Sequence, residues 1–249
     1  MAHVISWDYL RKNQTMHNNP IICAVDTTDV TQARSLAEQL SGCVGALKLG
    51  LEFFTANGAA GVAQVASPDF PVFLDLKFHD IPNTVAKAVN ATAGIDTFLM
   101  TVHSAGGAAM MKAAAEAASQ NAEKTGRRRA MVVGVTVLTS LDEGDLHSIG
   151  VEGGVLAQVV RLAELAQQSG LDGVVCSPHE IEAIRRACGA DFKLVVPGIR
   201  PAGSAAGDQK RVLTPKEALE KGADYLVIGR PITEAQDPGA AAKSIVESL

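Results

Sequence analysis

A chain of 249 residues is long enough for one large α/β domain or two small ones. Its apolar content of 47% and charged content of 20% are ordinary for a soluble globular enzyme. The net charge of −5 argues against a nucleic-acid-binding surface, and no apolar stretch is long enough to span a membrane. Residues 1–19 have no apolar signal-peptide core, and the four cysteines form no C-x-x-C pair. We therefore expect a cytoplasmic protein without a disulfide framework.

Short apolar runs, each followed by a helical pattern, recur along the whole chain. The alternation predicts a single α/β domain, a (β/α)8 TIM barrel, over residues 20–249, after an N-terminal extension of residues 1–19. A doubly wound open sheet is the alternative, but no G-x-G-x-x-G follows the first strand. Strands are expected at 21–25, 46–49, 72–76, 98–102, 131–137, 174–175, 194–196 and 225–228. Helices are expected at 30–40, 53–65, 84–93, 108–122, 155–168, 179–188 and 215–221, with a last helix ending near residue 249.

The third predicted strand carries charge at its carboxyl end. Asp75 and Lys77 follow the apolar run 71–74, and side chains two apart on a strand face the same way. Pro82 then ends the strand and suits the first turn of a helix. Charge at the end of a buried strand is costly unless it is paired, so these residues form either an ion pair or an active site.

Charged residues end the first three predicted strands. Asp26 ends the first strand, Lys48 lies late in the second, and Asp80 lies just beyond Asp75 and Lys77. The carboxyl ends of barrel strands meet at one rim, which carries the chemistry in such folds, so we expect these five groups to converge there. The alternative is a structural ion-pair network. Three carboxylates could also hold a metal, although the two lysines would compete with a cation for the space.

A second polar group follows the last two predicted strands. The seventh strand ends at 196–200, with Pro197 and Arg200, and a loop of small residues follows at 201–209. The eighth strand ends at Gly229 and Arg230, directly before a helix. Loops in these positions form the usual phosphate site of such barrels. The alternative is a helix cap beside a surface arginine.

The remaining candidates favour structural roles. We expect His79 and His103 to serve packing, and the basic run 127–129 to be a solvated turn. The histidines lack metal-ligand spacing, and the sequence contains neither a nucleophile elbow nor a P-loop.

These motifs resemble those of the orotidine 5′-monophosphate decarboxylase family, whose members catalyse the last step of UMP synthesis. Residues 75–84, DLKFHDIPNT, match the family signature, which is highly specific. The resemblance extends from residue 21 to the end of the chain, and a mild departure lies in the small residues after His103. Its other segments are 24–26, 47–50, 135–140, 197–201, 207–209 and 228–230.

The resemblance implies a cofactor-free and metal-free decarboxylase that acts as a homodimer on a small nucleotide. Lys77 would be the proton donor to C6 of the pyrimidine, and Asp75 would lie beside the substrate carboxylate. Lys48 and Asp80 would complete the charged array. The other implied substrate contacts are Asp26 and Lys48 for the ribose; Thr139 and Ser140 for the pyrimidine; Arg200, Gln209, Gly229 and Arg230 for the 5′-phosphate; Pro197; and Asp80, Ile81 and Thr84 from the partner subunit.

Two other functions share these features. Magnesium-dependent barrels, such as 3-keto-L-gulonate 6-phosphate decarboxylases and hexulose-phosphate aldolases, resemble the D-x-K-x-x-D pattern but carry an acidic metal ligand in place of Lys48. A catalytically silent nucleotide-binding protein on the same fold is the other possibility, because fold alone does not determine activity. An ammonium group at residue 48 argues against the first, and an intact charged array argues against the second.

Overall fold

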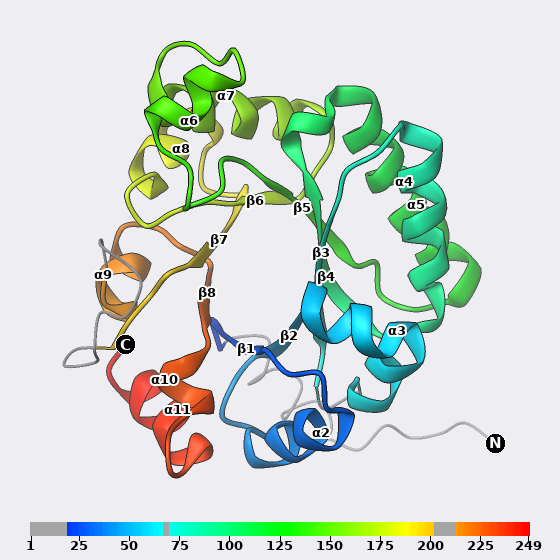
Figure 1. Ribbon diagram of the computed structural model, residues 1–249, viewed down its shortest axis with the longest axis vertical. Helices are drawn as coiled ribbons and strands as arrows, with labels where there is room; N and C mark the ends of the chain where they lie inside the picture. The colour runs from blue at the N-terminus through cyan, green and yellow to red at the C-terminus, as the bar shows by residue number, and fades with distance from the viewer. Residues whose placement is uncertain (1–18, 67–69, 202–212) are drawn as a thin grey trace.

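The computed structural model describes residues 19–66, 70–201 and 213–249. Their strands close into a parallel barrel in chain order, and helices surround it (Figure 1). The predicted (β/α)8 TIM barrel is therefore confirmed over the open sheet. Residues 1–18 of the predicted extension lie outside the described residues. The strands are β1 (Ile21–Val25), β2 (Ala46–Gly50), β3 (Val72–Phe78), β4 (Thr97–His103), β5 (Met131–Val135), β6 (Gly173–Val175), β7 (Lys193–Pro197) and β8 (Tyr225–Ile228).

The helices follow the strands as the periodicity predicts, with two differences described below. They are α2 (Val30–Gln39), α3 (Leu51–Val65), α4 (Pro82–Ala91), α5 (Ala108–Thr125), α6 (Glu143–Ser148), α7 (Gly154–Gln168), α8 (Ile181–Cys188), α9 (Pro215–Glu220), α10 (Arg230–Thr233) and α11 (Pro238–Glu247). None of the described helices is long and apolar enough to cross a membrane.

Alternation along the strands separates two apolar cores. One core contains only strand residues and fills the barrel interior, with Ile22, Phe73 and Leu99 among its members. The other core lies between the strands and the helices, where Leu47 and Leu74 pack against helical side chains. Odd residues of β3, even residues of β1 and β2 and, from Leu99 onward, odd residues of β4 therefore face the interior. This parity decides which side chains reach the mouth of the barrel.

The structure differs from the predicted elements at two short helices. α6 lies inside the segment that we expected to be a loop, because its six residues bury only Leu146 and show no helical periodicity. Its sequence signal is a capping box formed by Asp142 and Asp145. The predicted last helix is two helices, because Asp237 caps a new helix at Pro238 by accepting the N–H of Ala240.

The four cysteines are buried thiols. Burial raises the pKa of Cys23 to about 12, and the nearby charge of Asp26 adds to the increase. A thiol with this pKa stays protonated and unreactive at neutral pH.

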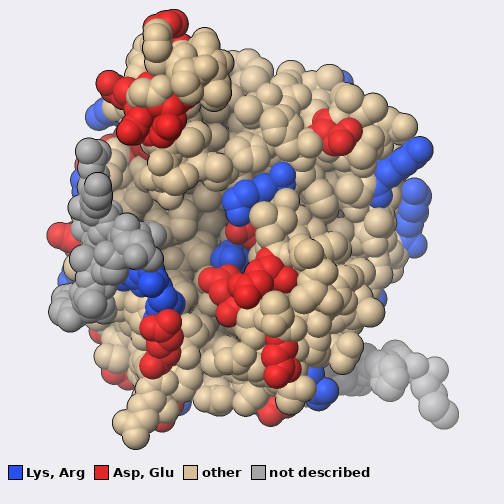
Figure 2. Space-filling view, viewed as in Figure 1, with Lys and Arg blue, Asp and Glu red and all other residues tan. Residues whose placement is uncertain are grey.

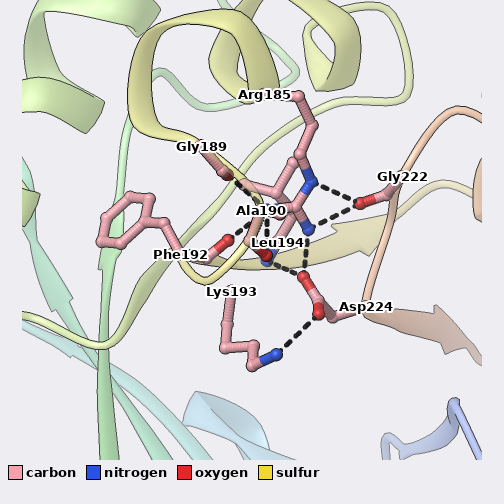
Figure 3. Close-up of polar contacts among 8 residues, drawn as sticks. All are labelled: Arg185, Gly189, Ala190, Phe192, Lys193, Leu194, Gly222 and Asp224. Carbon is pink, nitrogen blue, oxygen red and sulfur yellow. Dashed lines mark hydrogen bonds and ion pairs between the residues drawn. The ribbon is translucent and has the colours of Figure 1, made fainter.

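An ion-pair network joins β7 and β8 at the amino ends of these strands (Figure 3). The Asp224 carboxylate accepts hydrogen bonds from the Leu194 amide at 2.8 Å, from Lys193 Nζ at 3.0 Å and from Arg185 Nη2. Arg185 also donates to the carbonyl of Gly222 and to three carbonyls of the turn after α8, those of Gly189, Ala190 and Phe192. One arginine thus satisfies carbonyls that helix and strand ends leave open.

A second network of the same kind joins β5 and β6. Asp172 lies directly before β6, and its carboxylate accepts a hydrogen bond from the Val132 amide at 2.7 Å. Both carboxylate oxygens also pair with Arg129 Nη1 at 2.8 Å. Arg129 Nε also donates to Ser119 Oγ at 3.0 Å. The prediction of a solvated turn holds for Arg127 and Arg128, which are exposed, and is wrong for Arg129. The pairing partner lies 43 residues along the chain, so the local pattern carried no sign of it.

We predict that Asp224→Ala destabilises the barrel and leaves the arrangement of residues at the carboxyl ends of the strands unchanged. The substitution leaves a strand amide and two cations without their acceptor, which we expect to cost about 2–4 kcal/mol. The melting temperature should then fall by roughly 5–15 °C. Urea and thermal denaturation measure the change, with Asp191→Ala, an exposed acid in the neighbouring turn, as control. Equal stability of the two variants would contradict a structural role for the network.

Candidate active site

Four charged side chains lie at the carboxyl ends of β1 to β3 and face the barrel interior. Lys48, Asp75 and Lys77 share the interior parity of Ala46 and Phe73, and Asp26 continues the interior face of β1. Figure 2 shows positive and negative side chains gathered in a hollow at the centre of this face. The apolar layer inside the barrel closes the hollow from below. The rim predicted from the sequence is therefore where these charges meet.

The Asp75 carboxylate lies between two ammonium groups. Lys77 Nζ contacts both carboxylate oxygens at 2.9 Å, and Lys48 Nζ lies 3.7 Å from Oδ2. Lys48 Nζ also lies 3.5 Å from Asp26 Oδ1. Only 13% of the Asp75 and Lys48 side chains is exposed, whereas 63% of Asp26 is. Charges so deeply placed are stable only in pairs, and each of these has an opposite neighbour.

Asp80 does not join this cluster. Among the described residues, its carboxylate forms no ion pair with Lys48 or Lys77, and instead accepts the Ile81 amide at 2.7 Å. Asp80, Ile81 and Thr84 all lie exposed at the start of α4, which begins at Pro82 as predicted. The structure thus brings together four of the five groups that we expected at one rim.

Lys77 has an unusual backbone. Its φ is +51°, the one positive φ of a non-glycine residue among those described. The conformation is costly for a residue with a side chain and tends to occur at functional sites. β3 also extends to Phe78, so Asp75 and Lys77 belong to an irregular end of the strand and do not follow it.

Sequence reasoning missed Thr101. This fully buried threonine of β4 accepts the Lys77 amide at 2.8 Å and donates its hydroxyl to Asp75 Oδ1 at 3.0 Å. A polar residue inside the apolar run 98–102 was the available signal.

Gly50 has a spatial role beside Lys48. A Cβ at this position would lie 3.1 Å from Lys48 Nζ, so the absent side chain leaves room for the ammonium group. Gly50 is also the β2 partner of Asp75, which brings its backbone next to the charged pair.

The two histidines near the site pack against each other. The ring centroids of His79 and His103 lie 5.4 Å apart. Burial lowers the pKa of His103, and electrostatic interactions with His79 and Lys77 lower it further. His103 is therefore neutral at neutral pH and adds no charge beside Lys77. This agrees with the packing role that we expected.

The predicted phosphate residues lie at the ends of β7 and β8. Pro197 ends β7, and Gly229 caps α10, whose first residue is Arg230. The Arg200 amide donates to Leu213 O at 3.1 Å, which closes the base of the loop that follows. Arg200 Nε is buried and has no hydrogen-bond partner among the described residues. Gln209 lies outside the described residues.

Thr139 and Ser140 form an exposed turn after β5. No three histidine, cysteine or carboxylate side chains of the described ranges come close enough together to hold a metal ion.

Comparison with known proteins gives consistent matches along the chain. A model of the family described as "Orotidine 5'-phosphate decarboxylase / HUMPS family" matches residues 19–245. The orotidine 5′-phosphate decarboxylase of Paramagnetospirillum magneticum is 57% identical over 231 residues, which cover 93% of this chain and 98% of that protein. The enzyme of the same name from Moorella thermoacetica is 51% identical over 243 residues, covering 97% and 96%.

Solved structures show the same likeness. The crystal structure of orotidine 5′-phosphate decarboxylase from Lactobacillus acidophilus has a TM-score of 0.83 and 35% identity, and the match covers 92% of this chain and 98% of the other. A conserved protein from Geobacillus kaustophilus has a TM-score of 0.80 and 37% identity, with 92% and 99% covered. The chain belongs to the orotidine 5′-phosphate decarboxylase / HUMPS family.

Proposed function

We propose that this chain decarboxylates orotidine 5′-monophosphate to UMP and CO2, the last step of pyrimidine nucleotide synthesis, without a cofactor. The observation that carries the proposal is the Asp75 carboxylate held between Lys77 and Lys48 at the barrel mouth. Relatives that are 50–57% identical over more than nine-tenths of the chain carry the name of this activity.

Charge placement at the site suits a reaction that forms a carbanion. Breaking the bond between C6 and the carboxylate carbon releases CO2 and leaves an electron pair at C6 that the pyrimidine ring delocalises poorly. The Lys77 ammonium stabilises this charge and donates a proton to C6, and solvent later restores the proton to the amine. A preorganised ammonium of this kind needs no reorganisation as the charge develops.

Asp75 acts on the substrate carboxylate in this proposal. Two carboxylates side by side repel, and the repulsion decreases as negative charge moves from the substrate carboxylate to C6. The two lysines pair with Asp75 and orient its carboxylate, with Lys77 Nζ only 2.9 Å away. Binding of the 5′-phosphate, remote from C6, offsets the cost of bringing the like charges together.

The position of Lys48 favours this reaction over those of the magnesium-dependent relatives. Its ammonium lies between Asp26 and Asp75, at 3.5 and 3.7 Å. A divalent cation bound by these carboxylates would need the same space. In our proposal Lys48 and Asp26 instead bind ribose hydroxyls.

The remaining substrate contacts are assigned by position. We assign the 5′-phosphate to Arg200, Gln209, Gly229 and Arg230, beside Pro197, and the pyrimidine to Thr139 and Ser140. Arg200 Nε is buried without a hydrogen-bond partner among the described residues, which supports an anion at this end of the barrel, since a buried guanidinium donor is normally paired. Phosphate sites after the last two strands are usual in this fold.

A homodimer completes the site in this proposal, with Asp80, Ile81 and Thr84 reaching the partner's substrate. Two observations support it. Asp80 pairs with neither lysine of its own subunit, and Ile81 is 67% exposed although it is a large apolar residue. An exposed charge beside an exposed apolar side chain is the composition of a contact surface.

The first prediction from this proposal is that the purified protein turns over orotidine 5′-monophosphate in the presence of excess EDTA. Loss of orotidine 5′-monophosphate absorbance should proceed at the same rate with and without the chelator. Lys77→Ala should reduce kcat at least about a thousandfold, because it removes both the charge at C6 and the proton. Lys112→Ala, an exposed lysine of α5, is the matched control and should keep full activity. Activity that appears only with Mg²⁺ on a sugar phosphate would overturn the proposal in favour of the magnesium-dependent reaction.

The second prediction concerns the phosphate. Arg230→Ala should raise KM for the nucleotide by about 10- to 100-fold, the value of one charge-assisted hydrogen bond to phosphate. Turnover of orotidine, which lacks the phosphate, should be the same for Arg230→Ala and the wild type. Arg34→Ala, an exposed arginine of α2, serves as control. An equal loss on both substrates would show that Arg230 does not act on the phosphate.

The third prediction concerns the partner subunit. Lys77→Ala and Asp80→Asn should each be inactive alone, whereas a refolded equal mixture should recover about a quarter of wild-type activity. Half of the dimers are then mixed, and each mixed dimer holds one site with an intact lysine and an intact partner aspartate. If Asp80 acts within its own subunit, the mixture stays inactive.

A further inference from the structure

β3 and β4 lose their regular pairing beside the active site. Leu74 pairs with Met100 and Phe78 with Val102, so residues 75–77 of β3 lie opposite Thr101 alone. Extra residues on one strand form a bulge, which bends the strand and re-aims its side chains. Here the bulge contains both Asp75 and Lys77, and it accounts for the positive φ of Lys77.

Where the bulge interrupts the backbone hydrogen bonds between β3 and β4, the Thr101 side chain supplies a hydrogen-bond acceptor in their place. Its hydroxyl oxygen accepts the Lys77 N–H at 2.8 Å, so the amide of the strained residue has a partner. The same hydroxyl donates to Asp75 Oδ1 at 3.0 Å. Because a hydroxyl has a single proton, and the Lys77 amide supplies the other hydrogen bond, that proton is directed at the carboxylate.

Burial makes this arrangement rigid. Thr101 is fully buried on the interior face of β4, two residues above Leu99 of the barrel core. Its β-branched side chain has few available rotamers, and no water competes for the hydroxyl at zero exposure. Asp75 Oδ1 therefore accepts hydrogen bonds from both the Thr101 hydroxyl and Lys77 Nζ.

We propose that Thr101 is a positioning residue for decarboxylation, holding the Lys77 backbone and the Asp75 carboxylate in register through one hydroxyl. The inference rests on the proposed roles of Lys77 and Asp75. Thr101 does not contact the reacting atoms in this account. It sets where the ammonium and the carboxylate lie relative to each other, and a misplacement of about 1 Å in such groups costs about a hundredfold in rate.

The test compares variants that differ by the hydroxyl alone. Thr101→Val keeps the shape of the side chain and should reduce kcat by about 10- to 100-fold, with KM for orotidine 5′-monophosphate changed by less than about threefold. Thr101→Ser restores the hydroxyl and should recover kcat to within about fivefold of the wild type. Thr97→Val is the control, because Thr97 is a buried threonine of the same strand whose hydroxyl has no hydrogen-bond partner among the described residues.

A second measurement does not depend on turnover. Amide hydrogen exchange should show Lys77 N–H exchanging at least about tenfold faster in Thr101→Val than in the wild type, and unchanged in Thr97→Val. If Thr101→Val fails to fold, Thr101→Ala against Thr101→Ser makes the same comparison.

Each outcome decides the proposal. An unchanged kcat in Thr101→Val overturns it, because the hydroxyl would then be dispensable. A Ser variant as slow as Val also overturns it, because restoring the hydroxyl would then not restore the rate. If the wild type does not act on orotidine 5′-monophosphate, the proposed function fails by itself. In that case the exchange rates decide whether Thr101 holds Lys77, and equal rates in all variants overturn the positioning role.

Discussion

The active site depends on one carboxylate shared by two cations. Asp75 lies between Lys77 and Lys48 at the mouth of the barrel, where it is largely withdrawn from water. Without it, two ammonium groups would lie close together above an apolar core, Lys77 would lose its carboxylate partner, and Lys48 would keep only Asp26. In the reaction that we propose, the same carboxylate opposes the negative charge of the substrate carboxylate. One residue would then both pair the two lysines and act on the substrate.

The two ends of the barrel use charge for different purposes. At the amino ends of the strands, Asp172 and Asp224 each accept an arginine and a strand amide, and all their partners are satisfied inside the protein. At the carboxyl ends, Lys48 and Lys77 reach one carboxylate from different strands, and the hollow leaves the array open to a ligand (Figure 2). A closed network holds strands together, whereas an open one is available for chemistry. This division follows the general separation of stability and catalysis in parallel barrels.

Much of the architecture followed from local patterns in the sequence. Apolar runs alternating with amphipathic helices predicted the barrel, because each pattern has a period that only one type of element satisfies. The i, i+2 spacing of Asp75 and Lys77 predicted that the two side chains would lie together, and Pro82 predicted the start of α4. Short polar elements were beyond this reasoning: the six residues of α6 bury a single leucine, so no periodicity could indicate them. Arg129 was misjudged because its partner, Asp172, is distant in the chain.

The sequence by itself determined the fold, the family resemblance and the identity of the charged residues, since these depend on periodicity and on residue types at short spacings. The tertiary structure alone decided how those residues meet. Closure of the barrel brought Lys48 to Asp75, and the bulge opposite Thr101 turned the Lys77 backbone to a positive φ. It also left Asp80 outside the charged cluster. The bulge depends on how two strands about 25 residues apart pair with each other, which the local pattern of either strand does not show by itself.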